Sequence, residues 1–292
     1  MKLRPLYIFI LFLLVLIGFE LLYTKLIFSA ETNAYSMGTL VRIKVEGGSS
    51  PHLARLALGE VKWIDKIFSR FDPDSEVSMI NKLAGRAPLE VSPETFECVK
   101  LAARISKLSG GAFDITLGHP RTLVIDADLR KIYLSQQGVK IDLGGIGKGF
   151  AAESARKLLL KKGAQSGMID LRSSITVFGP KAWKVGIQHP RDQGKLIGAV
   201  ELLDGESLAT SGDYERGEHI RDPRTGKPAR GCQSVTVIGE NAAEADALST
   251  AVFVLGSEQG IKLIESLPGI EALVVDRSGK IIKSSGFALV KP

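Results

Sequence analysis

The sequence predicts a single α+β domain over residues 31–292, with a mixed or antiparallel sheet and packed helices, preceded by an N-terminal membrane anchor over residues 1–30. Three observations predict this arrangement. Segments with strand-like alternation and segments with helical spacing of apolar residues follow one another along the chain. No repeat, low-complexity tract or long linker divides it. A chain of 292 residues, 45% of them apolar, can build one large core.

The anchor is predicted from the first residues of the chain. Lys2 and Arg4 precede an apolar run over 6–19, and apolar residues resume after Glu20. A basic start followed by such a run is typical of a secretion signal. Bulky residues just before Ser29 are unfavourable for cleavage, so we expect an uncleaved anchor. The positive-inside rule then places the domain at the inner (cytoplasmic) membrane, facing the periplasmic or extracytoplasmic side.

The first elements expected in the domain are a strand and two helices. Residues 40–45 alternate between apolar and polar side chains, which predicts a half-buried strand. Apolar residues recur at helical spacing over 51–70, and the Asp- and Pro-containing stretch 71–75 predicts a turn. A second helix is expected over 92–109, because serine, proline and glutamate stand at its start and two glycines follow it. Short strands are expected at 132–134 and 139–141.

The segment 142–149 contains four glycines in eight residues, together with Lys148. It follows a short apolar run and precedes a helical pattern that continues to Lys162. Glycines let the backbone approach a ligand closely, and a helix start offers unpaired N–H groups to an anion. The segment matches neither a Walker A loop nor a dinucleotide fingerprint. It predicts either a phosphate- or pyrophosphate-binding turn or a tight strand-to-helix turn without a ligand.

The C-terminal half is expected to be rich in strands, with two helices before a final hairpin. Alternating or short apolar runs bounded by turn residues carry this expectation. The expected strands are 167–171, 175–178, 183–187, 198–202, 207–211 and 233–239, the helices are 242–255 and 257–266, and the hairpin strands are 273–276 and 281–282.

Charge and cysteine content exclude several classes of function. The net charge is +6, but the cations are scattered and form no basic stripe with aromatic residues, so we expect no nucleic-acid partner. The two cysteines, Cys98 and Cys232, are far apart and lack CxxC partners. A disulfide framework and a cysteine-based zinc site are therefore excluded. One long-range disulfide stays open as an alternative, and two buried thiols are expected.

Two further segments carry residues suited to chemistry. Residues 218–228 combine His219 with several cations, which fits a loop that contacts phosphates or an ordinary surface hairpin. Asp246 and Thr250 are four residues apart in an expected helix and therefore share one face. A carboxylate with a hydroxyl suits Mg²⁺. The same aspartate could instead interact only with the helix dipole.

Seven segments of the chain are informative as a set. They are 37–39, 68–76 with Asn81 beyond, 111–116, the glycine turn at 142–149, 210–214, 219–226 and 245–256. Together they resemble the FAD:protein FMN transferases, the ApbE-like flavin transferases, in order and approximate spacing from Tyr35 onward. The resemblance implies the flavin transferase fold in an extracytoplasmic enzyme that binds FAD and requires Mg²⁺. Such an enzyme transfers FMN to a threonine hydroxyl of an acceptor flavoprotein and releases AMP. The implied acceptor belongs to a membrane redox complex or is an extracytoplasmic reductase.

The resemblance also implies roles for the matching residues. Asp246, Thr250 and the main-chain carbonyl of Gly145 are expected to hold Mg²⁺. Asp246 and His219 are the expected catalytic residues, His219 by contacting the reacting phosphate or by helping to deprotonate the threonine. The residues expected to bind FAD are Lys148, with the glycine turn, on the phosphates, and Met37, Phe71, Ala112, Phe113, Asp114, Asp142 and Ile220 along the cleft.

One segment departs from the family pattern. Where the family usually has Asn-x-Gly-Gly-Asp, this chain reads Asp170-Leu171-Arg172-Ser173-Ser174. We therefore expect the metal and phosphate ends of the site to be retained and the flavin-facing turn to be changed. Two alternatives stay open: an FAD pyrophosphatase that produces FMN and AMP, and a non-catalytic FAD-binding relative.

Overall fold

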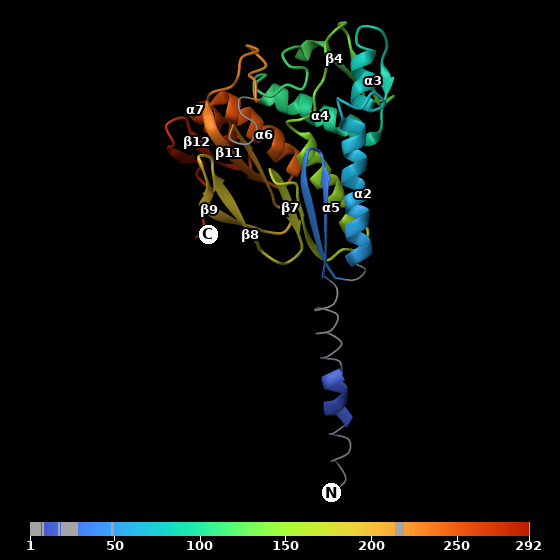
Figure 1. The fold of residues 1–292 in the computed structure, drawn as a ribbon, viewed down its shortest axis with the longest axis vertical. Helices are drawn as coiled ribbons and strands as arrows, with labels where there is room; N and C mark the ends of the chain where they lie inside the picture. Colours follow the sequence, from blue (N-terminus) through green and yellow to red (C-terminus); the bar gives the residue numbers. More distant parts are fainter. Residues whose placement is uncertain are drawn as a thin grey trace.

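An eight-stranded sheet forms the centre of the protein (Figure 1). The structure is a computed structural model that describes residues 7, 9–16, 18, 29–47, 50–213 and 219–291. All neighbouring strands of the sheet run antiparallel, so the sheet is antiparallel and not mixed. In spatial order the strands are β1 (Ser29–Ser36), β2 (Thr39–Glu46), β6 (Ser166–Asp170), β7 (Ser174–Phe178), β10 (Ser207–Gly212), β11 (Cys232–Gly239), β12 (Glu271–Asp276) and β13 (Ile281–Lys283).

Helices cover one face of this sheet. Successive strand residues point to opposite faces, and Ile43 of β2 and Val274 of β12 belong to the face that packs on the helices. Helix α2 (Ser50–Phe68) buries residues at three- and four-residue spacing, among them Ala57, Val61 and Ile64, as its sequence pattern predicts. The covering helices are α2 (Ser50–Phe68), α5 (Gly147–Lys161), α6 (Ala242–Leu255) and α7 (Ser257–Glu265).

A two-stranded ribbon, β8 (Trp183–His189) and β9 (Asp192–Leu202), covers part of the other face. Trp183 and Leu202 of the ribbon form a second apolar cluster with Val177 of β7 and Leu273 of β12. Because β7 is covered on both faces, all five of its residues are buried. The ribbon also forms one wall of a large cleft.

A smaller layer of helices and short strands stands at one end of the sheet (Figure 1). Ser92 caps α4 by accepting a hydrogen bond from the N–H of Thr95, as its sequence predicts. The elements of this layer are α3 (Glu76–Lys82), α4 (Pro93–Leu108), the 3₁₀ turn η1 (Pro120–Thr122) and the three-stranded sheet β3 (Leu89–Glu90), β5 (Lys131–Leu134) and β4 (Leu123–Asp126).

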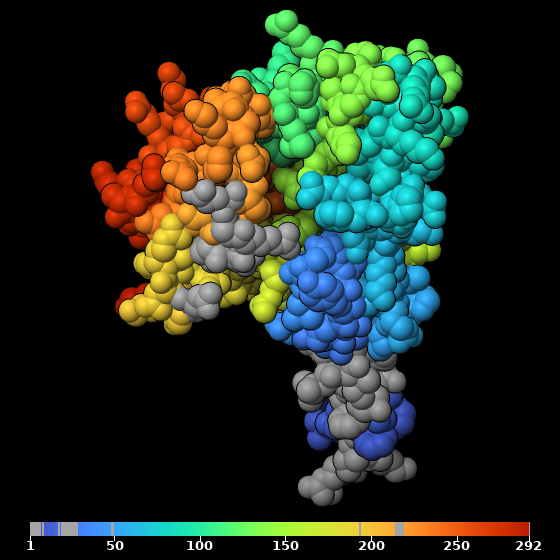
Figure 2. Space-filling model, turned by 45° about the horizontal axis from the view of Figure 1, so that its top comes forward, coloured from blue at the N-terminus to red at the C-terminus, as the bar shows by residue number. Residues whose placement is uncertain are grey.

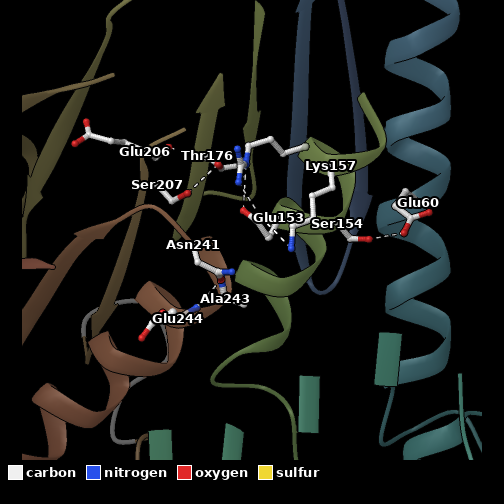
Figure 3. Close-up of polar contacts among 11 residues, drawn as sticks. Glu60, Glu153, Ser154, Lys157, Thr176, Glu206, Ser207, Asn241, Ala243 and Glu244 are labelled. Carbon is white, nitrogen blue, oxygen red and sulfur yellow. Dashed lines mark hydrogen bonds and ion pairs between the residues drawn. The ribbon is translucent and has the colours of Figure 1, made fainter. Parts of the chain in front are cut away.

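Polar contacts fix α5 in the centre of the helical layer (Figure 3). Ser154 of α5 donates to Glu60 of α2 at 2.5 Å. On the same helix the buried carboxylate of Glu153 pairs with Arg156 at 2.7 Å and with Lys157 at 3.4 Å. Since Arg156 is also largely buried, this pair resists separation better than a surface ion pair. The Ser154–Glu60 bond thus joins α5 to α2, whereas the Glu153 pairs lie within α5 itself.

The structure corrects some expectations for individual elements. Residues 139–141 are not a strand, because the N–H and carbonyl of Ile141 bond the side-chain amide of Asn81 instead of a neighbouring strand. The strands β1, β3 and β4 have no counterpart in the sequence prediction, since they are polar or very short. The expected hairpin of β12 and β13 is confirmed, and both cysteines are buried thiols.

The predicted anchor over residues 1–30 falls largely outside the described residues. Residues 9–16 are helical. Within the described ranges no helix has both the length and the apolar character to cross a bilayer. Strand β1 begins at Ser29, so it includes the last two residues of the segment assigned to the anchor.

Candidate active site

One cleft of about 1320 Å³ opens between the helical layer, the loop that follows α4, the main sheet and the β8–β9 ribbon. Figure 2 looks onto a hollow between the cyan segment that follows α2 and the orange segment near residue 220. The volume exceeds that of pockets for drug-sized ligands. All residues predicted to form the site line this cleft: Met37, Phe71, Ala112, Phe113, Asp114, Asp142, Gly145, Lys148, His219, Ile220, Asp246 and Thr250.

The glycine turn places the start of α5 at the cleft. The N–H of Asp142 donates to the carbonyl of Ile115 at 2.8 Å, which fixes the entry to the turn. The N-cap residue Ile146 offers no side-chain hydrogen bond to the helix. Of the first N–H groups of the helix, that of Gly147 donates to the carbonyl of Leu143 at 2.7 Å, and that of Gly149 donates to the Asp246 side chain. The turn brings Lys148 and the glycine backbone to the cleft, where both can contact an anion.

Asp246 lies on α6 directly against this helix start. Its side chain is almost fully buried, and its Oδ2 accepts the N–H of Gly149 at 2.8 Å. Burial raises the pKa of the Asp246 carboxyl, while the charge of Lys148 and the Gly149 N–H act in the opposite direction. A buried carboxylate of this kind is more stable with a cation beside it.

Gly145 and Thr250 meet beside this carboxylate. A Cβ placed on Gly145 would lie 3.3 Å from Oγ1 of Thr250 and 3.2 Å from the ring of Phe113. The absence of a side chain thus allows the backbone of the turn to approach α6. Thr250 Oγ1 also lies 3.2 Å from Oγ of Ser211 on β10.

These residues fit Mg²⁺ as the resemblance implies. Asp246, Thr250 and the Gly145 carbonyl supply a carboxylate, a hydroxyl and a carbonyl, and Mg²⁺ prefers such oxygen ligands. Among the described residues no group of three or more His, Cys, Asp or Glu side chains could enclose a metal ion. The protein would thus supply part of a coordination shell, which suits an ion that retains waters or phosphate oxygens.

The rim of the cleft is shaped by Arg70 and Asp65. Arg70 binds Asp142 at 2.8 Å and stacks 4.8 Å from the ring centre of Phe71, which is 83% exposed. The carboxylate of Asp65 accepts the N–H of Met37 at 2.7 Å. These contacts involve three predicted FAD-binding residues, Asp142, Phe71 and Met37. An exposed aromatic ring beside a cleft is available for stacking on a ligand.

Asp114 has a mainly structural environment. Its carboxylate accepts hydrogen bonds from the N–H and hydroxyl of Thr116 and from the N–H of Gly118. It lines the cleft, but these bonds stabilise its own turn. His219 and Ile220 enter the cleft from the opposite side, His219 exposed and Ile220 packed partly against the main core.

The turn between β6 and β7 lies beside Lys148. The ammonium of Lys148 donates to the hydroxyl of Ser173, and the carbonyl of Ser173 accepts the N–H of Thr210 at 2.8 Å. The changed turn, which was expected to face the flavin, thus contacts the lysine that was expected to bind phosphate.

Several lining residues were missed from the sequence. Arg70 lies in the family-like segment 68–76 and Asp65 lies just before it, but their partners Asp142 and Met37 are distant in sequence. The ribbon residues Ile187, Gln188 and Leu196 carry no motif at all, and only packing of the ribbon brings them to the cleft. A pattern that reports local structure has no signal for such contacts.

Comparison with known proteins agrees with this geometry. The model of the ApbE family matches residues 37–124 and 119–274. An FAD:protein FMN transferase of Treponema pallidum is 30% identical, covering 86% of this chain and 85% of its own length. One from Klebsiella pneumoniae is 28% identical, covering 87% and 91%.

Solved structures share the fold. The ApbE protein of Thermotoga maritima is 33% identical with a TM-score of 0.80, covering 88% of this chain and 97% of its own. A mutant of the flavin transferase ApbE from Vibrio cholerae is 25% identical with a TM-score of 0.79, covering 89% and 98%. The family match spans most of the chain and includes all predicted site residues, so this chain belongs to the ApbE family.

Proposed function

We propose that this protein is an FAD:protein FMN transferase, which cleaves FAD and transfers FMN to a threonine of an acceptor flavoprotein with release of AMP. The observation that carries the proposal is that every predicted site residue lines one cleft large enough for a dinucleotide. The relatives that bear this name match 86% and 87% of this chain.

The residues of the cleft divide into two groups in this proposal. Lys148 and the glycine turn before α5 bind the pyrophosphate of FAD. Met37, Phe71 and Phe113 supply apolar surface for the ring systems. His219 contacts the reacting phosphate or accepts the proton of the threonine hydroxyl.

Asp246, Thr250 and the Gly145 carbonyl would hold Mg²⁺ in the proposed enzyme. The bound ion would neutralise the pyrophosphate and polarise the phosphorus under attack. Asp246 is fixed for this purpose by its bond to Gly149, and Thr250 by the contact between the turn and α6. The low polarity around Asp246 strengthens its attraction for a cation.

The decisive experiment incubates the full chain, in detergent, with FAD and a threonine-bearing acceptor protein, with and without Mg²⁺. We expect Mg²⁺-dependent AMP, measured by chromatography, and an equal amount of acceptor that has gained the mass of FMN. Removal of the metal with EDTA should reduce AMP release to background, and added Mg²⁺ should restore it.

Each other outcome identifies an alternative. AMP together with an equal amount of free FMN, with no flavin on any threonine-bearing acceptor, would indicate an FAD pyrophosphatase. Retention of FAD without AMP under any metal condition would indicate a non-catalytic FAD-binding protein. Either result contradicts the transferase proposal.

We further propose that an N-terminal segment anchors the enzyme in the inner membrane, with the cleft on the extracytoplasmic side. The basic residues Lys2 and Arg4 before an apolar run support this orientation. The full chain is expected to sediment with membranes and to be degraded by protease added outside spheroplasts. Protection from that protease, or recovery in the soluble fraction, would contradict the proposal.

A further inference from the structure

The cleft contains an unusual concentration of strained backbone. In the described part of the chain four residues other than glycine have left-handed φ angles: Met37, Leu117, Arg130 and Arg172. Three of the four line the cleft, and only Arg130 does not. Side chains with a Cβ rarely adopt this conformation, and such residues gather at functional sites. Met37 was already predicted to contact FAD, whereas Arg172 has no assigned role.

The hairpin turn between β6 and β7 fixes the conformation of Arg172. Its φ is 67°, and its N–H donates to Asp170 at 2.6 Å. The N–H of Leu171 donates to Ser174 and that of Ser173 donates to Leu171, so the turn is closed by its own backbone. Glycine is the residue best suited to such a position. An arginine there suggests a use for its side chain.

The guanidinium of Arg172 differs from those of the other arginines in the cleft. Arg70 pairs with Asp142, and Arg221 donates to the carbonyl of Gly226 at 2.9 Å. Arg172 is exposed, and its guanidinium makes no hydrogen bond or ion pair with any described residue. Its five donors are therefore available to a ligand.

The next residue connects Arg172 to the predicted phosphate site. Ser173 accepts a hydrogen bond from the ammonium of Lys148, and Lys148 lies close enough to Asp246 for their charges to interact. Arg172 and Lys148 both line the cleft, and the residue next to Arg172 in the turn contacts Lys148. Arginine binds phosphate oxygens with a planar fork of donors, which lysine lacks.

We propose that Arg172 binds a phosphate oxygen of the dinucleotide, so that the β6–β7 turn and the start of α5 together form the anion site. This inference rests on the proposed function, since it takes the ligand to be FAD. Ser173 is a positioning residue, because it acts through Lys148.

The test measures binding to the full chain in detergent with Mg²⁺ present, using ADP, FAD and riboflavin as separate ligands. Arg172→Gln should weaken the affinity for ADP and for FAD by roughly 10- to 100-fold, as expected for loss of a charged hydrogen bond. It should leave the affinity for riboflavin unchanged. Arg130→Gln is the matched control, because Arg130 is also a left-handed arginine in a hairpin turn but lies outside the cleft. It should change none of the three affinities.

A second pair of variants separates binding from structure. Arg172→Gly and Arg130→Gly should both raise the melting temperature of the ligand-free protein, since glycine relieves the left-handed strain. Only Arg172→Gly should weaken the binding of ADP. A merely structural arginine would instead give a lower melting temperature with unchanged ADP affinity.

Three results would overturn the assignment. The first is an unchanged ADP affinity in Arg172→Gln. The second is an equal loss of riboflavin affinity in the same variant, which would place the guanidinium on the flavin ring. The third is no binding of ADP to the unaltered protein. Failure of the proposed function would give a different result. The unaltered protein would then bind ADP, and Arg172→Gln would weaken that binding, but FAD would release no AMP.

Discussion

Replacement of Asp246 by asparagine is expected to reduce Mg²⁺-dependent AMP release from FAD by about a thousandfold or more, since a metal ion supplies several kcal/mol of charge stabilisation in such reactions. Asparagine has nearly the same shape, and its oxygen can still accept the N–H of Gly149. The substitution therefore removes the charge without opening a cavity.

The same variant should be more stable than the unaltered protein when metal is absent. Burial raises the pKa of Asp246 in the folded protein above its value in the unfolded chain. A carboxyl group with a raised folded pKa makes the fold less stable as the pH increases, so its charge is unfavourable at neutral pH. The neutral amide avoids this effect, and sites that bind cations commonly sacrifice stability in this way.

The measurements are AMP release and thermal unfolding with and without Mg²⁺. Mg²⁺ together with ADP should raise the melting temperature of the unaltered protein and leave that of Asp246→Asn unchanged. Glu244→Gln is the control, because Glu244 lies on the same helix but outside the cleft, where it pairs with Arg104. Near-normal AMP release by Asp246→Asn would show that the carboxylate holds no metal.

Replacement of Gly149 by alanine should destabilise the protein by about 3 kcal/mol or more, the upper range for overpacking a core. A Cβ at this position would lie 2.2 Å from the carbonyl oxygen of Ala242 and 2.7 Å from the Cβ of Asp246. Both obstacles belong to α6, and one is backbone, so no side-chain rotation can make room. The separation of α5 and α6 would also move Asp246 away from the glycine turn.

Gly147 provides a matched comparison in the same turn of helix. A Cβ there would meet only side-chain atoms, Cε of Met37 at 3.4 Å and Cδ2 of Phe68 at 3.5 Å, which are ordinary van der Waals distances. Gly147→Ala should therefore change the free energy of unfolding, measured with urea, by less than about 1 kcal/mol, because alanine favours the helix. Equal stabilities for the two variants would show that α5 and α6 do not pack as closely as the structure indicates.

Local features of the sequence predicted much of the fold. The apolar spacing of α2, the serine and proline that begin α4, and the turn of the β12–β13 hairpin all concern neighbouring residues, and these elements form where they were expected. The strand predicted at 139–141 was wrong, because a distant side chain, that of Asn81, satisfies its backbone. Apolar character alone could not reveal that partner.

By itself the sequence determined the glycine turn, the shared helical face of Asp246 and Thr250, and the order of family segments, because each depends on spacing along the chain. Only the tertiary structure decided that Ser173 contacts Lys148 and that Arg70 pairs with Asp142. It also decided that the β8–β9 ribbon lines one side of the cleft. These contacts join segments far apart in the chain, and their partners are chosen by packing on the two faces of the sheet, which no local pattern records.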